Sequence, residues 1–395
     1  MTTSGAQQGI RPGVCLSTSR PASPFIGQVI YMTDVNQSAV WNGTSWEGLD
    51  RSRDRNEIIN GSMQVAQRGT SVTSITTIGY NTADRWVGGS SGAGTWTNAV
   101  VADAPTGSGL TNSNKWTCTT AQASLGASAY ALVYQNIEGQ NLQRLSFGSA
   151  SASSVTLSFW VKSNVTGTYI AELYGPGGIS ASYTISSSGV WEKKILTYVG
   201  NTATAIANNN SNGLSVQFML AAGTNFTSGG SLQTSWGSAT NTRFFGQVNV
   251  ASAINNYWQI TGVQLEAGVV ATPFEFEDYS ETLRKCQRYY FRVGGDSIYQ
   301  RYGVGAFSAA TTARCVINNP VPMRILPTNI ESSTIAVFDQ TTVIAVTGFA
   351  LGTAGSGKNL TQFDVTVASG GTQYRPIELI ANNSTSSYIG VNAEL

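Results

Sequence analysis

The sequence predicts an all-β protein, built from several β modules and one short helix. Residues 155–162 and 214–220 alternate strictly between apolar and polar side chains, as half-buried strands do. Loops rich in glycine, serine and asparagine separate such segments, with no 10–15-residue helical pattern between them. Charged residues make up only 11% of the chain and aromatic residues 10%, a composition that favours β-structure.

Residues 11–48 are predicted to form a compact β unit. Short strands are expected at 29–31 and 39–41, and the turn Asn42-Gly43-Thr44 predicts a hairpin that leads back into residues 45–47. So small a unit buries too little apolar surface to be stable alone. We therefore expect it to need a neighbouring domain or oligomer partners.

The densest charges of the chain lie in residues 50–55, where the signs alternate. This pattern is typical of a solvated junction, and we expect residues 49–60 to form a linker or a short helix. The chain has 22 Lys and Arg against 21 Asp and Glu and no basic run, which argues against nucleic acid as a partner. Residues 1–60 are assigned to the N-terminal module and its linker.

Residues 61–279 are predicted to form a β-sandwich of the jelly-roll kind, because many antiparallel strands follow one another without helices. Further strands are expected at 169–174, 190–199 and 257–265, and no repeat of fixed period indicates a β-helix or propeller. The side chains expected to face inward are Val155, Leu157, Phe159, Val161, Leu214, Val216, Phe218 and Leu220. Those expected on the opposite face of the first strand are Thr156, Ser158, Trp160 and Lys162.

One amphipathic segment predicts a helix after the sandwich. Asp278 and Glu281 have the spacing of a capping box, apolar residues follow at helical spacing, and Gly294-Gly295 would end the helix. We place a linking helix at 280–295 and a second, smaller β domain at 296–395. Strands in that domain are expected at 333–338, 342–347 and 363–367.

The chain contains no histidine, which excludes Ser-His-Asp and Cys-His catalysis and His-ligated zinc. Its four cysteines are far apart and form no CxxC pair, so no metal site and no cofactor are expected. Residues 352–359 nearly match a phosphate-binding loop, but Asn359 replaces the required Ser or Thr and a strand follows. A glycine-rich hairpin loop explains this stretch better.

Carboxylate chemistry is the enzymatic alternative that the composition leaves open. Hydrolysis of a glycosidic bond needs two carboxylates about 5–10 Å apart. Glu138, Glu172 and Glu192 could meet in space, whereas the acidic residues around 275–278 are explained by the start of the helix.

Aromatic side chains on polar strand faces suit sugar binding. An aromatic ring stacks on the C–H face of a sugar, while neighbouring polar side chains form hydrogen bonds with the sugar hydroxyl groups. Packing against another domain or subunit is the alternative for each of them. The candidates on the sandwich are Trp160, Lys162, Tyr169 and Trp258, and those on the C-terminal domain are Tyr299, Tyr302, Tyr374 and Tyr388.

Several stretches in order resemble tail-fibre proteins of bacteriophages, including those that infect cyanobacteria. Residues 20–31 and 39–46 resemble the N-terminal attachment module of such fibres. Similarity to their central domain lies in 59–69, 83–86, 157–163, 259–268, 271–275 and 284–290. The resemblance covers about 270 residues and implies a jelly roll like those of carbohydrate-binding modules, in a homotrimeric fibre.

This resemblance implies an adhesion protein rather than an enzyme. The partners it implies are other copies of the chain, tail or baseplate proteins at the N-terminus, and host surface polysaccharide or lipopolysaccharide. No nucleic acid partner and no membrane insertion are expected, since no run approaches 18 apolar residues. A virion protein is made in the host cytoplasm and acts outside cells after lysis, which agrees with the missing secretory signal. A glycan-depolymerising tailspike and a purely structural tail component remain the alternatives.

Overall fold

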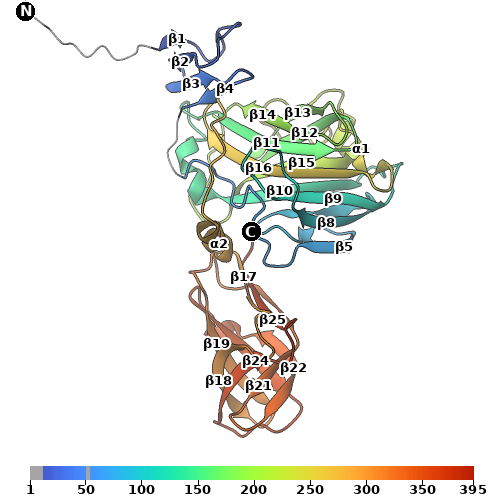
Figure 1. Cartoon of the computed structure of the whole chain (residues 1–395), viewed down its shortest axis with the longest axis vertical. Helices are drawn as coiled ribbons and strands as arrows, with labels where there is room; N and C mark the ends of the chain where they lie inside the picture. The colour runs from blue at the N-terminus through green and yellow to red at the C-terminus, as the bar shows by residue number, and fades with distance from the viewer. Residues whose placement is uncertain (1–11, 50–53) are drawn as a thin grey trace, which may run out of the picture.

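The computed structural model describes residues 12–49 and 54–395, and residues 50–53 of the predicted junction lie outside these ranges. Three β bodies follow one another along the longest axis of the molecule (Figure 1). A small N-terminal sheet lies at one end, a two-sheet sandwich in the middle and a closed barrel at the other end. The predicted all-β class is confirmed.

The N-terminal sheet contains the predicted hairpin and one strand more. Its order is β1 (Gly13–Cys15), β2 (Val29–Met32), β3 (Gln37–Trp41) and β4 (Trp46–Gly48), with β1 parallel to β2. Ile30, Met32 and Trp46 share one small apolar cluster with Val270 of the sandwich. The unit therefore completes its core on its neighbour, as its size requires.

The sandwich consists of two six-stranded antiparallel sheets. Sheet I has the order β13 (Gly177–Ile185), β12 (Gly167–Gly175), β15 (Asn212–Ala222), β10 (Tyr130–Glu138), β7 (Val87–Ser91) and β6 (Gly79–Tyr80). Sheet II has the order β14 (Glu192–Tyr198), β11 (Val155–Ser163), β16 (Tyr257–Ala267), β9 (Ser113–Thr120), β8 (Thr95–Val101) and β5 (Ser71–Ile75). Short helical turns lie in the loops: η1 (Gly139–Leu145), α1 (Thr224–Thr227) and η2 (Val250–Ser252).

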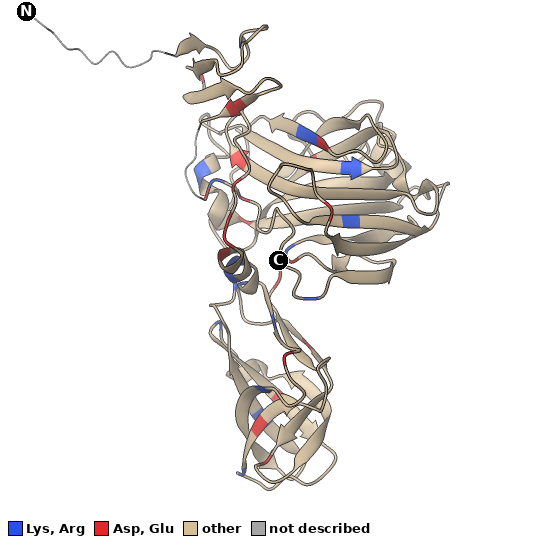
Figure 2. Ribbon diagram, in the orientation of Figure 1, with Lys and Arg blue, Asp and Glu red and all other residues tan. Residues whose placement is uncertain are grey.

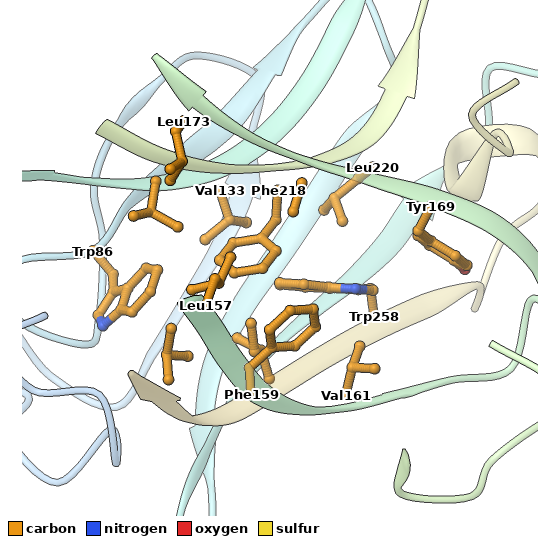
Figure 3. Close-up of a cluster of buried hydrophobic side chains, with 14 of the residues drawn as sticks. Trp86, Val133, Leu157, Phe159, Val161, Tyr169, Leu173, Phe218, Leu220 and Trp258 are labelled. Carbon is orange, nitrogen blue, oxygen red and sulfur yellow. The ribbon is translucent and has the colours of Figure 1, made fainter. Parts of the chain in front are cut away.

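The core between the sheets is aromatic (Figure 3). Phe218 of sheet I packs on both Phe159 and Trp258 of sheet II, with its ring centroid 5.0 and 5.5 Å from theirs. All eight side chains predicted to face inward are buried. The opposite face of β11 is covered as well, because Thr156 is fully buried and Lys162 bonds Asp103 of the segment that crosses sheet II.

Helix α2 (Tyr279–Gln287) starts where the sequence predicts, with Asp278 at the N-cap. The capping-box prediction is wrong, because the Asp278 side chain makes no cap bond and Glu281 pairs with Arg284 instead. The predicted extent 280–295 is also wrong. The helix ends at Gln287, and β17 (Tyr290–Gly294) follows because its backbone pairs with a strand nearly 100 residues away.

The C-terminal body is a six-stranded barrel with a three-stranded sheet beside it. The barrel order is β18 (Arg301–Ala309), β19 (Thr312–Asn318), β23 (Leu360–Val367), β22 (Val343–Leu351), β21 (Ile335–Phe338) and β24 (Pro376–Ala381). The sheet contains β17, β25 (Tyr388–Asn392) and β20 (Asn329–Ser333). Residues 352–359, with the turn η3 (Thr353–Gly355), join antiparallel β22 to β23, which confirms the hairpin reading of the glycine-rich stretch.

Barrel and sandwich meet at a junction formed by α2, β17 and residues 393–395, which run back to the sandwich (Figure 1). Several charged residues lie at this junction, whereas the sandwich strands carry few (Figure 2). The Glu394 carboxylate pairs with Arg85 and Arg68, and their guanidinium groups stack on Tyr289 and Tyr290, each 3.5 Å from the ring centroid. Glu138, fully buried, accepts two bonds from Arg288 and one from Tyr289.

Two buried carboxyl groups of the sandwich make stability depend on pH. Burial raises the pKa of Glu57 from 4.5 to about 7, against the attraction of Arg144, and raises the pKa of Asp84 from 3.8 to about 6. Each group binds more protons in the folded than in the unfolded chain between those values. The free energy of unfolding should therefore fall by a few kcal/mol as the pH rises from about 4.5 to 7, at about 1.4 kcal/mol per pKa unit.

Thermal unfolding between pH 4.5 and 8 measures this slope. Glu57→Gln should flatten it, whereas Glu281→Gln, which changes an exposed carboxylate with a lowered pKa, should leave it unchanged. A stability that rises through this interval would contradict the prediction.

Candidate functional site

Two predicted sandwich candidates, Trp160 and Lys162, lie on the outer face of sheet II, and both are half-buried. The Lys162 ammonium donates to Asp103 at 2.5 Å and lies 5.3 Å from the Trp191 ring. Asp103 also accepts from the Trp191 indole at 3.1 Å. Lys162 and Trp191 therefore lie together around the Asp103 carboxylate. The Lys162 ammonium group is already paired with that carboxylate.

The other two sandwich candidates, Tyr169 and Trp258, require a correction. Both side chains are 0% exposed and belong to the core between the sheets (Figure 3). The Trp258 indole donates to the Tyr183 hydroxyl, and the Tyr169 ring stacks on Tyr183. Neither ring presents a face to a ligand, because both side chains point inward from their strands.

The four candidates of the C-terminal body do not form one site. Tyr302 is buried and bonds Ser387, and the half-buried Tyr388 lies beneath the Arg292 guanidinium. Tyr299 and Tyr374 are exposed, but they flank opposite ends of the β18–β24 pair. The paired part of β18 runs from Arg301 to Ala306, six residues, so those ends are about 17 Å apart at the rise of an extended chain.

Sequence reasoning missed an aromatic groove on the outer face of sheet I, with a volume of about 370 Å³. We call it the sheet I groove. Its floor is a row across three strands, in which Tyr134 of β10 lies opposite Gln217 of β15, and Gln217 lies opposite Glu172 of β12. The lining residues are Ile78, Tyr130, Leu132, Tyr134, Tyr174, Gln217, Met219, Phe226, Arg243 and Phe244.

The long loop 223–249 forms one wall of the groove. Phe244 is buried against Leu132 and Met219, and its backbone N–H bonds the Phe226 carbonyl at 3.0 Å. The Phe226 ring meets Tyr130 edge to face, with centroids 5.8 Å apart. This packing fixes the loop, and so it fixes Arg243 next to Phe244.

At the other end of the groove, Arg243 is held over Glu172 and Tyr174. Its Nε and Nη2 donate to the two Glu172 carboxylate oxygens at 2.8 and 2.5 Å, and the guanidinium lies 4.3 Å from the Tyr174 ring centroid. Burial opposes the charge of Arg243, but the Glu172 bonds outweigh it and raise its pKa. Burial raises the pKa of Glu172, with Arg243 acting against it.

The groove combines flat rings with hydrogen-bonding groups. Tyr174 is 41% exposed, and Tyr130 and Tyr134 are half-buried. Burial, with a smaller contribution from Tyr130, raises the pKa of the Tyr134 phenol, so its hydroxyl stays neutral and can both donate and accept. Such a surface can stack on an apolar ring face and bond hydroxyl groups at its edge.

The three carboxylates considered for catalysis do not meet. Glu172 and Glu138 lie two strands apart in sheet I and are offset by four residues, about 16 Å for strand spacings of 4.8 and 3.3 Å. Glu192 lies in sheet II and bonds Lys194. This separation exceeds the range of a glycosidase pair.

Two polar hollows lie near α2. One, of about 500 Å³, is lined by Arg144, Lys285 and Arg288 among others, and each of these cations has a carboxylate partner. The other, of about 440 Å³, is lined mainly by acidic residues around 275–281. In residues 12–49 and 54–395, no three His, Cys, Asp or Glu side chains are placed to hold a metal ion. No helix in that described part is long and apolar enough to cross a membrane.

No protein-family model and no curated protein matches the chain. Among solved structures, the enzymatically active domain of tailspike protein 4 of bacteriophage CBA120 matches with 14% identity and a TM-score of 0.30. That match covers 54% of this chain, which spans about a fifth (21%) of the tailspike chain.

Two carbohydrate-binding proteins of Clostridium thermocellum also match. A family 11 carbohydrate-binding module in complex with a β-1,3-1,4-mixed-linked tetrasaccharide has 11% identity and a TM-score of 0.25, covering 51% of this chain and 98% of the module. A two-module N-terminal part of endo-1,4-β-D-xylanase 10B, complexed with xylohexaose, has 14% identity and a TM-score of 0.25. That match covers 57% of this chain and 33% of the xylanase chain.

Proposed function

We propose that the chain is a phage tail-fibre protein that attaches the virion to the host cell by binding surface glycans in the sheet I groove. The observation that carries this proposal is the groove itself. Tyr130, Tyr134 and Tyr174 line it next to Gln217 and Arg243, on the outer face of sheet I. Flat rings beside fixed donors are what a sugar needs for recognition.

The arrangement of the bodies agrees with a fibre component. The N-terminal sheet lies at one end of an elongated molecule (Figure 1), and Val14 of β1 and Phe25 and Ile26 of the β1–β2 loop are 56%, 70% and 76% exposed. Exposed apolar side chains on so small a unit favour burial against a partner. In this proposal the sheet docks to the tail or baseplate, and the fibre is a homotrimer made in the host cytoplasm that acts outside cells.

Binding rather than cleavage is the proposed activity. Single sugar sites are weak, and three grooves per trimer would raise the apparent affinity through avidity. Light scattering on the purified chain should give three times the chain mass. Incubation with host lipopolysaccharide should release no oligosaccharide, whereas shortening of the polysaccharide would favour the depolymerase alternative.

Tyr134→Ala combined with Tyr174→Ala should reduce binding to host cells and to their purified surface polysaccharide about ten-fold per groove. Each ring contributes roughly 0.5–1.5 kcal/mol of stacking, and about 1.4 kcal/mol is a factor of ten. Isothermal titration and labelling of host cells with the fluorescent chain measure the loss.

Tyr374→Ala is the matched control, because this tyrosine is 79% exposed on the barrel and lies outside the groove. It should leave binding unchanged. A loss of binding with Tyr374→Ala, and none with the double variant, would move the site to the barrel and contradict the groove proposal.

A further inference from the structure

We infer that the sheet I groove selects neutral glycans over acidic ones, and that Glu172 sets this preference by neutralising Arg243. The inference rests on the proposed function. Arg243 is the one charged residue among those that line the groove in the described part of the chain. Whether its charge reaches a ligand depends on the carboxylate behind it.

Glu172 is placed to cancel that charge. Its side chain is 0% exposed, and both of its oxygens accept from Arg243, whose side chain is 18% exposed. The groove therefore shows the donor face of a guanidinium with almost no net charge. Two opposite charges held this close form a short dipole, whose attraction for a third charge is much weaker than that of a lone cation.

An acidic sugar gains little from such a pair. Its carboxylate would lose hydration on entering an apolar groove, and the Glu172 charge directly behind the guanidinium would repel it. A hydroxyl group loses far less hydration and can accept a hydrogen bond from the guanidinium. The remaining guanidinium nitrogen, Nη1, has no protein acceptor among the described residues, so a sugar hydroxyl could take that bond.

Glu172 is a positioning residue in this account, since it acts through Arg243 and lies beneath it. Glu172→Gln keeps the size of the side chain and one acceptor oxygen but removes the negative charge. Arg243 would then present an uncompensated charge to the groove. The ratio of acidic to neutral glycan binding should rise about ten-fold, an effect that a purely structural role of Glu172 would not produce.

The experiment compares how the wild-type full chain and its variants bind to a glycan array. The array carries neutral hexasaccharides of glucose, galactose or mannose, together with acidic hexasaccharides of uronic acids. The wild type should bind neutral members and bind acidic ones at least ten-fold more weakly. Glu172→Gln should gain acidic members. The double variant Glu172→Gln with Arg243→Gln should lose that gain. Both charges of the pair are then removed, so the groove is neutral again and no unpaired cation is buried.

The outcomes separate this inference from the proposed function. A wild type that binds acidic hexasaccharides as well as neutral ones, with both lost in the Tyr134→Ala and Tyr174→Ala variant, would overturn the selectivity and leave the glycan site standing. A Glu172→Gln chain that folds, by its circular dichroism, and keeps the wild-type ratio would also overturn it. A wild type that binds no member, or binding that persists without the two tyrosines, would contradict the proposed function.

Discussion

Trp258→Ala should lower the free energy of unfolding of the sandwich by about 3–5 kcal/mol, the usual loss when a buried tryptophan is truncated. The ring has no exposed surface and packs on Phe218 across the two sheets. Its indole N–H bonds the buried Tyr183 hydroxyl at 3.2 Å, so the substitution leaves both a cavity and an unpaired hydroxyl. Urea unfolding followed by circular dichroism measures the loss.

Trp160→Ala is the matched comparison on the neighbouring strand of sheet II. Trp160 is half-buried on the outer face, where it lies against Gly262 with Leu110, so its loss should cost about 1 kcal/mol. Equal losses for the two variants would show that the core is not centred where Figure 3 places it.

Side chains of a strand point alternately to its two faces. This alternation explains why the strands could be predicted, and it also shows why two of the binding candidates were misplaced. The alternation within 155–162 and 214–220 located β11 and β15 and their inward faces. Tyr169 points to the same face of its strand as Ala171 and Leu173, which are core residues. The alternation within this strand therefore predicts that Tyr169 is buried. Tyr174 and Glu172 point to the opposite face of the same strand, so the alternation predicts that Tyr174 faces outward, where the groove lies.

The rest of the groove has no sequence signal of its own. Arg243 and Phe244 lie in a long loop without periodicity, and their place over β12 depends on contacts with residues 18 to 112 positions away. Barrel closure is non-local in the same sense, since β24 pairs with β18 about 75 residues earlier. The helix prediction overran into β17 because strand pairing with β25 outweighed a local helical pattern.

Glu394→Gln should destabilise the junction between sandwich and barrel by about 3–5 kcal/mol, the cost of breaking a buried ion pair from one side. The Glu394 side chain is 5% exposed and neutralises two arginines, Arg85 at 1% and Arg68 at 8%. Arg85 would keep its bond to the Asn136 carbonyl and its place over Tyr289, but it would have no carboxylate partner within salt-bridge distance among the described residues. Glutamine fills the same space, so the loss reports the charge rather than a cavity.

The loss should be local to the junction. Residues 393–395 lie between the two bodies, and Arg324 of the barrel side also bonds the carbonyls of Ala393 and Glu394. Hydrogen exchange should therefore speed up in β17 and β25 before it does in the sandwich core. Glu378→Gln, which breaks the exposed pair with Arg301, should cost less than about 1 kcal/mol and leave exchange unchanged. If Glu394→Gln behaves like Glu378→Gln, the buried charges do not hold the barrel to the sandwich, and the apolar contacts of β17 must do so instead.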